Sequence, residues 1–407
     1  MGLLSLGGIF GFYAPKGLSR EKAEDFLARG LSFLRHRGEG GWRLFFSSSQ
    51  GWRSLEGEGV APLSLPDGPF AWGLGAVFRG AQHPGWLTFP KGALVFAGRL
   101  PRLPREGDLA KESLSLEGAL AFLAADGPFF YAARDRQGHK PLYAAREEEG
   151  FFFASEGGPG FPGWEKEGGP LPGGILFRFG PEGFMPLKNP WGAAKGDTRV
   201  CAFEALYHCR PDSLLVGTRV YALRHAMGRL LAREAPAPGD VVVGVPDSGT
   251  AAAHGYAEET RLPLVMGLWK NPYLGRTFLR SAPQERDWAL SQKLFAIPEA
   301  VAGRRVVMVD DSIVRGATVA WNVKLLRQAG AREIHVRIAS PPVVKGCPYG
   351  LLGVEEGALF QSHPEALPVE SLAYLSLSAF DEALSQGEEM SFCRACFGKE
   401  AHRLVPL

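Results

Sequence analysis

The stretch VVMVDDSIVRGAT, residues 306–318, decides the fold of the second half of this 407-residue chain. Its four leading apolar residues predict a buried strand that ends in two adjacent carboxylates, Asp310 and Asp311. A helix is predicted over VAWNVKLLRQAG (319–330), and EIHVRI (333–338) predicts the next strand. Strand, loop, helix and strand in this order form a βαβ unit. We therefore expect a parallel α/β sheet with ligands at the carboxyl ends of its strands.

The pattern of apolar runs and turn residues changes near residue 195, so the chain divides there into two parts. VVVGV (241–245), followed by PDSGT and a helix-like AAAHGYAEE, repeats the strand–loop–helix pattern in the second part. The first part has short aromatic and aliphatic runs separated by glycine, which indicate strands and hairpins, with one helix expected over 19–33. We predict two units, residues 1–192 and 193–407.

Composition narrows the class of protein. Hydrophobic residues make up 45% and charged residues 22%, and the formal net charge is +2, which is typical of a soluble globular protein without a nucleic-acid or membrane partner. No apolar run approaches the ~20 residues of a membrane span, and the apolar start lacks the basic region of a secretory signal. Five cysteines, an odd number, favour a reducing, cytoplasmic setting.

The loop after the first of these strands has the chemistry of a phosphorylated-sugar site. Asp310 and Asp311 can accept hydrogen bonds from sugar hydroxyls or hold Mg²⁺ through water. Gly316 lets backbone N–H groups approach an anion at a helix N-terminus, and Arg315 adds a permanent cation. The alternative is that the two carboxylates only cap the next helix. Paired carboxylates directly after an apolar strand need cations or donors, which favours the ligand site.

VVMVDDSIVRGATV resembles the phosphoribosyl-pyrophosphate (PRPP) loop of type I phosphoribosyltransferases. The sequence on both sides of this loop resembles that of one family, glutamine PRPP amidotransferase, also called amidophosphoribosyltransferase. Matching segments cover nearly the whole second half: CAFEALYHCRPDS (201–213), GVPDSGTAAAHGYAE (244–258), GLWKNPYLGRTF (267–278) and HVRIASPPVVKGCPYG (335–350). The resemblance implies an N-terminal Ntn-hydrolase-like αββα sandwich joined to a C-terminal type I phosphoribosyltransferase α/β domain.

The resemblance also implies roles for individual residues. Asp310 and Asp311 would contact the ribose hydroxyls and Mg²⁺, and Ser248 would help to bind that ion. The ribose 5-phosphate would lie in a cradle made by Ser312, Ile313, Val314, Arg315, Gly316 and Thr318. Lys270 and Arg276 would lie on a loop that closes over the pyrophosphate. The sequence departs from the family pattern at Pro272, where arginine is usual, and at Ala317, where threonine is usual. Both changes are expected to weaken substrate binding.

The cysteines allow several interpretations. Cys393 and Cys396 form a CxxC pair, which with His402 could belong to a zinc site. Some members of the resembled family hold a 4Fe–4S cluster, and the four matching positions here are Cys201, Cys347, Cys393 and Cys396. Unligated buried thiols are the alternative. Cys209 stands where the family usually has alanine and is expected to be a small core residue.

The first half resembles the family's glutaminase domain without its nucleophile. Where the family begins with Cys-Gly-Ile-x-Gly, this chain has GGIFG (7–11), and Gly7 offers no thiol and no N-terminal amine. The oxyanion-hole Asn-Gly of the family becomes Ala97-Gly98, and its Arg-Tyr-Ser segment becomes FRG (78–80). Ser5 could act as a nucleophile after cleavage, but it precedes the motif by two residues.

The sequence therefore predicts an enzyme of purine nucleotide biosynthesis that makes 5-phosphoribosylamine and pyrophosphate from PRPP and ammonia, without hydrolysing glutamine itself. Purine nucleotide inhibitors and a homodimer or homotetramer are implied by the resemblance. One alternative is a catalytically weak paralogue that binds PRPP or nucleotides and regulates a genuine amidotransferase. A salvage transferase that uses a nucleobase is the other, and it would need a base-binding hood.

Overall fold

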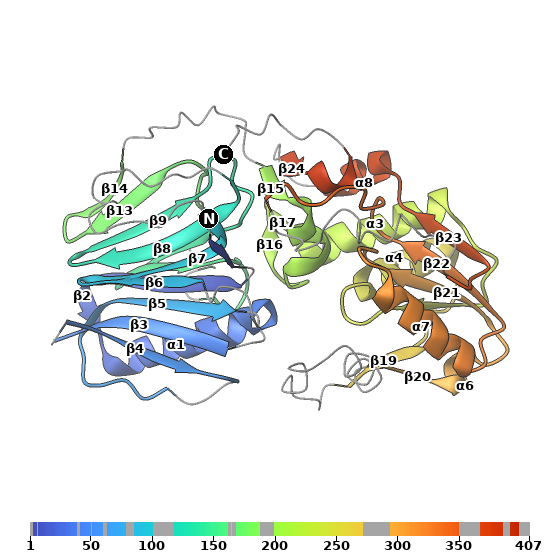
Figure 1. The fold of residues 1–407 in the computed structure, drawn as a ribbon, viewed down its shortest axis with the longest axis horizontal. Helices are drawn as coiled ribbons and strands as arrows, with labels where there is room; N and C mark the ends of the chain where they lie inside the picture. Colours follow the sequence, from blue (N-terminus) through green and yellow to red (C-terminus); the bar gives the residue numbers. More distant parts are fainter. Residues whose placement is uncertain are drawn as a thin grey trace.

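The fold is seen in a computed structural model that describes most of the chain. The described residues are 3–5, 7–38, 41–49, 51–59, 63–78, 85–100, 118–161, 164, 168–187, 199–271, 294–349, 367–385 and 391–398. Figure 1 shows two bodies side by side, the first half of the chain forming one and the second half the other. The predicted boundary between residues 192 and 193 lies outside the described residues.

The first half is a sandwich of two seven-stranded antiparallel sheets, which is the predicted Ntn-hydrolase-like architecture. One sheet has the order β1 (Leu3–Ser5), β7 (Gly92–Leu100), β8 (Leu120–Asp126), β9 (Phe129–Arg134), β13 (Leu176–Gly180) and β14 (Gly183–Pro186), with β6 (Trp86–Phe89) beside β7. The other has the order β12 (Gly168–Pro170), β10 (Tyr143–Glu147), β11 (Gly150–Ala154), β2 (Gly8–Leu18), β5 (Phe70–Phe78), β3 (Gly41–Ser48) and β4 (Gly51–Gly57).

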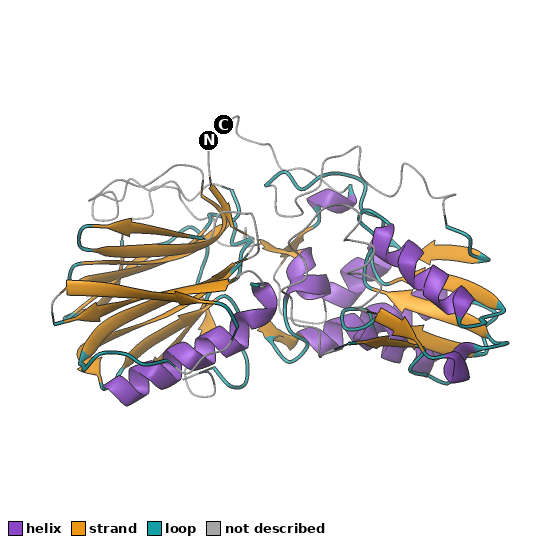
Figure 2. Ribbon diagram, turned by 60° about the horizontal axis from the view of Figure 1, so that its bottom comes forward, coloured by secondary structure: helices purple, strands orange, loops and turns teal. Residues whose placement is uncertain are grey.

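The strand β2 contributes side chains to two apolar cores, one on each face of its sheet. Because side chains alternate along a strand, Ile9 and Tyr13 join the apolar layer between the sheets, whereas Phe10 and Phe12 face α1 (Arg20–Leu34). This helix forms the outer layer on the second sheet (Figure 2). It begins as predicted, since the Ser19 hydroxyl accepts a hydrogen bond from the Lys22 N–H.

The second half is built on a parallel sheet, as predicted. Its order is β18 (Val241–Gly244), β21 (Arg305–Asp310), β22 (Glu333–Ile338) and β23 (Ser371–Tyr374). Its helices are α3 (Val220–Glu234), α4 (Thr250–Thr260), α6 (Pro298–Val301), α7 (Ala317–Gln328) and α8 (Leu377–Leu384). Three strand pairs complete it: β15 (Arg199–Cys201) with β24 (Ser391–Cys393), β16 (Leu214–Leu215) with β17 (Thr218–Arg219), and β19 (Leu268–Lys270) with β20 (Leu294–Ala296).

The sheet is buried on both faces, which explains why its strands read as continuous apolar runs. In β21, Val307 and Val309 join the core on the side of α3 and α4. Val306 and Met308 join the core on the side of α7. Among the described helices, none is both long and apolar enough to cross a lipid bilayer.

Candidate active site

Two buried carboxylates lie at the carboxyl end of β21. Asp310 and Asp311 are each 5% exposed. The Asp311 N–H donates to Asp310 Oδ1 at 2.9 Å, and the Ser312 hydroxyl donates to Asp311 Oδ2 at 2.7 Å. Burial raises the pKa of Asp310 well above its usual value, and the neighbouring Asp311 raises it further. A pair of this kind is unfavourable unless a cation or hydroxyl donors from a ligand satisfy it.

The loop after β18 lies against these carboxylates. β18 and β21 are parallel neighbours, and the Val245 N–H donates to Val309 O at 2.9 Å. A Cβ on Gly249 would lie 2.9 Å from Asp310 Cα, so the loop can approach this closely only with glycine there. The half-buried Ser248 is therefore at the same edge of the sheet as Asp310.

Lys270 ends β19 and reaches the same loop. Its ammonium forms an ion pair with Asp247, the residue before Ser248. Lys270 is thus tied to the loop that follows β18, and its role toward pyrophosphate stays a prediction; Asp247 is a partner that the sequence analysis did not name. Arg276 and Pro272 lie outside the described residues.

The predicted phosphate cradle joins β21 to α7. Gly316 has φ of 82° and precedes the first residue of α7, a conformation that favours glycine. Ile313 is buried and anchors the loop, whereas Arg315 and Thr318 are exposed beside the helix N-terminus. The described loop therefore offers backbone N–H groups and a helix dipole to an anion.

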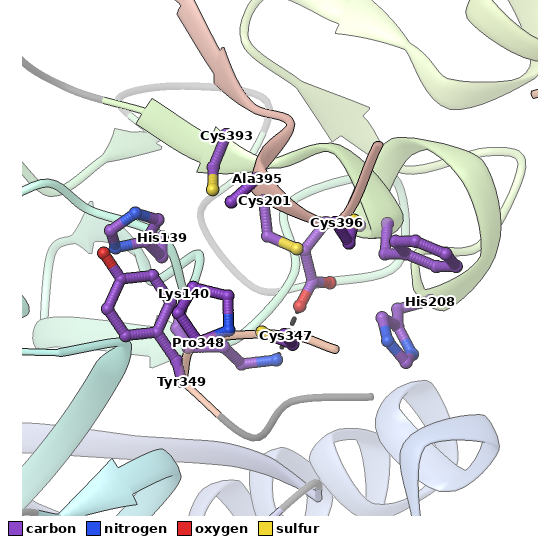
Figure 3. Close-up of a pocket in the computed structure, with 12 residues that line it drawn as sticks. His139, Lys140, Cys201, His208, Cys347, Pro348, Tyr349, Cys393, Ala395 and Cys396 are labelled. Carbon is purple, nitrogen blue, oxygen red and sulfur yellow. Dashed lines mark hydrogen bonds and ion pairs between the residues drawn. The ribbon is translucent and has the colours of Figure 1, made fainter. Parts of the chain in front are cut away.

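The four predicted cluster cysteines line one pocket. Figure 3 shows Cys201, Cys347, Cys393 and Cys396 around it, with His139, Lys140 and Tyr349 on its wall. Cys201 and Cys393 are register partners in the parallel pair of β15 and β24. Burial raises the pKa of Cys201 well above its usual value, and the nearby sulfurs of Cys393, Cys347 and Cys396 raise it further.

The cysteines supply the donor type that both predicted metal sites need. Within the described residues, no three His, Cys, Asp or Glu side chains converge on a single ion position. A 4Fe–4S cluster takes four thiolates, and the four predicted cysteines line one pocket. His402, the third member of the zinc alternative, lies outside the described residues.

His139 is a polar wall residue of this pocket that the sequence did not single out. Its Nδ1 donates to Asp135 Oδ1 at 2.9 Å. Burial lowers the pKa of His139, but Asp135 and Cys393 raise it to about 10. Burial raises the pKa of Cys393, but His139, the Ala395 backbone N–H and Arg199 together lower it below its usual value.

A buried network of charges joins the two halves. Arg37 forms an ion pair with Glu156 and donates to Glu204 Oε2 at 2.6 Å, and Lys140 donates to Glu204 Oε1 at 2.6 Å. His36 donates to Glu156 Oε1 at 2.5 Å. Burial alone would raise the pKa of Glu156, but Arg37 and His36 lower it to about 2. Both glutamates are therefore held as carboxylates inside the protein.

The network also includes residues near the predicted substrate site. The Cys209 thiol lies 3.2 Å from Arg37 Nη2, so this cysteine belongs to a polar cluster as well as to the apolar core that the sequence predicted. The buried Arg224 donates to Cys209 O at 2.8 Å and interacts electrostatically with Asp311. The sequence holds one signal for this network. Glu156 in FASE and Glu204 in CAFE are each a single acidic residue in an apolar run, which indicates a buried carboxylate.

The backbone closes in on Gly7, the position where the family pattern has its cysteine. A Cβ on Gly7 would lie 1.8 Å from Val77 O, well inside any real contact distance. β1 pairs with β7 so that Ser5 is opposite Gly98. Residues 3–5 are thus paired along the strand that carries Ala97 and Gly98.

Comparisons with known proteins agree with this architecture. A family model described as a glutamine amidotransferase domain matches residues 107–158. The amidophosphoribosyltransferase of Archaeoglobus fulgidus is 38% identical over 320 residues, 75% of this chain and 68% of that protein. That of Bacillus subtilis is 30% identical over 96% of this chain and 92% of that protein. That of Mycobacterium tuberculosis is 38% identical over 70% of this chain but only 55% of that protein.

The solved structure of the B. subtilis glutamine PRPP amidotransferase, complexed with ADP and GMP, matches with a TM-score of 0.80 and 28% identity. This match covers 97% of the present chain and 96% of that one. Two relatives at 30% identity or more therefore align over more than two thirds of both chains, and the same fold extends over both halves. The chain belongs to the amidophosphoribosyltransferase family.

Proposed function

We propose that this protein forms 5-phosphoribosylamine and pyrophosphate from PRPP and ammonia, and that it does not hydrolyse glutamine. The observation that carries the proposal is the buried pair Asp310 and Asp311 at the end of β21, against the loop that carries Ser248 and that Lys270 reaches through Asp247. Burial and the neighbouring carboxylate disfavour the ionised form of Asp310, and the hydroxyls of a ribose or a Mg²⁺ ion would stabilise that form.

In the proposed reaction, the ammonia lone pair forms a bond to C1 of the ribose while the bond from C1 to the pyrophosphate oxygen breaks. The electron pair leaves with pyrophosphate, and the nitrogen then loses one proton to solvent. Positive charge develops on the ribose ring, where Asp310 and Asp311 lie, and negative charge grows on the leaving group. Mg²⁺, when held at Ser248 and the two aspartates, would neutralise part of that diphosphate charge.

Among the described residues, Lys270 is the cation that would stabilise the charge on the leaving pyrophosphate. Its present partner is Asp247, an exposed carboxylate on the loop after β18. We propose that pyrophosphate, with its higher charge, replaces this carboxylate as the partner of Lys270. Arg276 would add a second cation on the closing loop, and the backbone from Ser312 to Gly316 with Thr318 would hold the 5-phosphate.

Glutamine hydrolysis is excluded from the proposal because Gly7 supplies no nucleophile. The carbonyl of Val77 occupies the space that a side chain there would need. Ammonia would therefore come from solution or from another protein. The four pocket cysteines would hold a 4Fe–4S cluster as a structural group, with no part in the transfer step.

The proposal is tested by measuring pyrophosphate release from PRPP and Mg²⁺ with either ammonium chloride or glutamine. Release with ammonium and none with glutamine is expected. Asp311→Asn should abolish it, whereas Asp240→Asn, at the other end of β21 in an ion pair with Arg305, should not. Turnover with glutamine would contradict the interpretation of Gly7. No turnover from either source would favour a PRPP-binding or nucleotide-binding regulator of another amidotransferase.

A further inference from the structure

The turn that carries His139 belongs to the first half of the chain but runs beside the cysteine-bearing strands of the second half. The Arg199 N–H donates to Gln137 O at 2.6 Å, and the Cys201 N–H donates to His139 O at 3.0 Å. β15 pairs in turn with β24, where Cys201 is opposite Cys393. The turn is therefore held in register with both strands.

Close contacts fix the His139 ring, which is 2% exposed. Nδ1 donates to Asp135 Oδ1 at 2.9 Å, and the ring centroid of Tyr349 lies 4.5 Å from that of His139. Both His139 and Cys393 line the pocket, and Figure 3 shows their side chains at the same end of it. The Asp135 carboxylate is fixed in turn by backbone N–H groups, those of Leu120, Gln137, His139 and Lys140.

We propose that His139 is a positioning residue for the iron–sulfur site, donating a hydrogen bond to the Cys393 sulfur and thereby raising the cluster's reduction potential and slowing its loss. This inference rests on the proposed function, because it requires that the four cysteines hold a cluster. An imidazole between a carboxylate and an iron-bound thiolate lies between two acceptors, so both ring nitrogens donate.

The physical reason lies in the electron density on sulfur. Hydrogen bonds to cluster sulfurs withdraw density from the iron–sulfur bonds and stabilise the more negative, reduced state. They also orient the ligand, and removing such an outer partner weakens metal binding by roughly 10–100-fold. The glutaminase-like half, although it lacks a nucleophile, would thus complete the site whose four sulfur ligands come from the other half.

The experiment compares full-length protein, purified without oxygen and reconstituted with iron and sulfide, with His139→Leu and His139→Gln. His225→Gln is the matched control, because this α3 imidazole pairs with Glu258 at 3.0 Å and does not line the pocket. Measurements are bound iron and sulfide, the midpoint potential followed by electron paramagnetic resonance, and the rate of cluster loss to an iron chelator. We expect His139→Leu to have a lower potential and roughly tenfold faster loss. His139→Gln should be intermediate, because its amide still donates, and His225→Gln should match the unaltered protein.

A fully loaded His139→Leu protein with unaltered potential and unaltered loss rate would overturn the inference. So would an unaltered protein that takes up no cluster, even if it releases pyrophosphate from PRPP and ammonium. Conversely, a normal cluster with the expected His139 effects but no pyrophosphate release would leave the inference standing and refute the transferase proposal. If His139→Leu fails to fold, His139→Asn, whose amide is too short to reach the sulfur, takes its place beside His139→Gln.

Discussion

Restoring the missing thiol should not restore a glutaminase. The change is Gly7→Cys, made both in the full chain and in a shortened chain in which the substituted residue becomes the N-terminus after removal of an initiator methionine. The new Cβ would lie 1.8 Å from Val77 O and 2.9 Å from Val77 C, whereas real contacts stay beyond 3.0 Å. β5 must therefore move by about 1 Å, and overpacking of this severity destabilises a core by ~3 kcal/mol.

Urea unfolding measures this loss as a lower midpoint at an unchanged slope, and ammonia release from glutamine measures activity. Gly169→Cys is the control, because a Cβ there meets nothing within 4 Å and its stability should stay within ~0.5 kcal/mol. We expect Gly7→Cys to be destabilised and inactive on glutamine. The reasoning would be refuted by a Gly7→Cys protein as stable as the Gly169→Cys protein, or by one that hydrolyses glutamine.

Three further outcomes follow from the site and the charge network. Asp310→Asn should lower ammonium-dependent pyrophosphate release by ~100-fold, yet raise the thermal midpoint of the ligand-free protein by relieving the buried carboxylate pair; a lower midpoint would contradict this account. Lys270→Ala should lower the rate with PRPP by ~100-fold while leaving the far-ultraviolet circular dichroism unchanged. Glu156 has an ordinary pKa of 4.5 that is lowered to about 2, so its contribution is complete above pH 4.5 and is lost as the pH falls towards 2. Denaturant unfolding should show that the unaltered protein loses ~3 kcal/mol more over this interval than Glu156→Gln does.

Local patterns predicted the elements that depend on neighbouring residues. The helix with Ser19 as its cap, the strand ending at Asp310 and the helix after Gly316 all form where the sequence indicated. Each is determined by periodicity, a cap or a glycine within a few residues, so the sequence alone suffices. The four cysteines of the family pattern do line one pocket, and their binding of a cluster stays a prediction.

Long-range pairs could not be predicted in this way. Arg37 and Glu204 are 167 residues apart in the chain, and no local pattern indicates that they meet. The same applies to His139, whose approach to Cys393 depends on how the two halves dock. Cys209 lies in the core as expected, but its polar neighbours come from both halves of the chain.

The ionised seam between the halves, formed by Arg37, Glu156, Glu204 and Lys140, has a consequence for assembly. Removing charges from water offsets much of their mutual attraction, so a seam of this kind adds little net affinity. It does penalise any misaligned docking heavily, because a displaced member would leave a buried charge without its partner. Since the polypeptide already keeps the halves close together, strong adhesion is unnecessary. What the seam can supply is a single permitted orientation, and the pocket walls contributed by both halves depend on it.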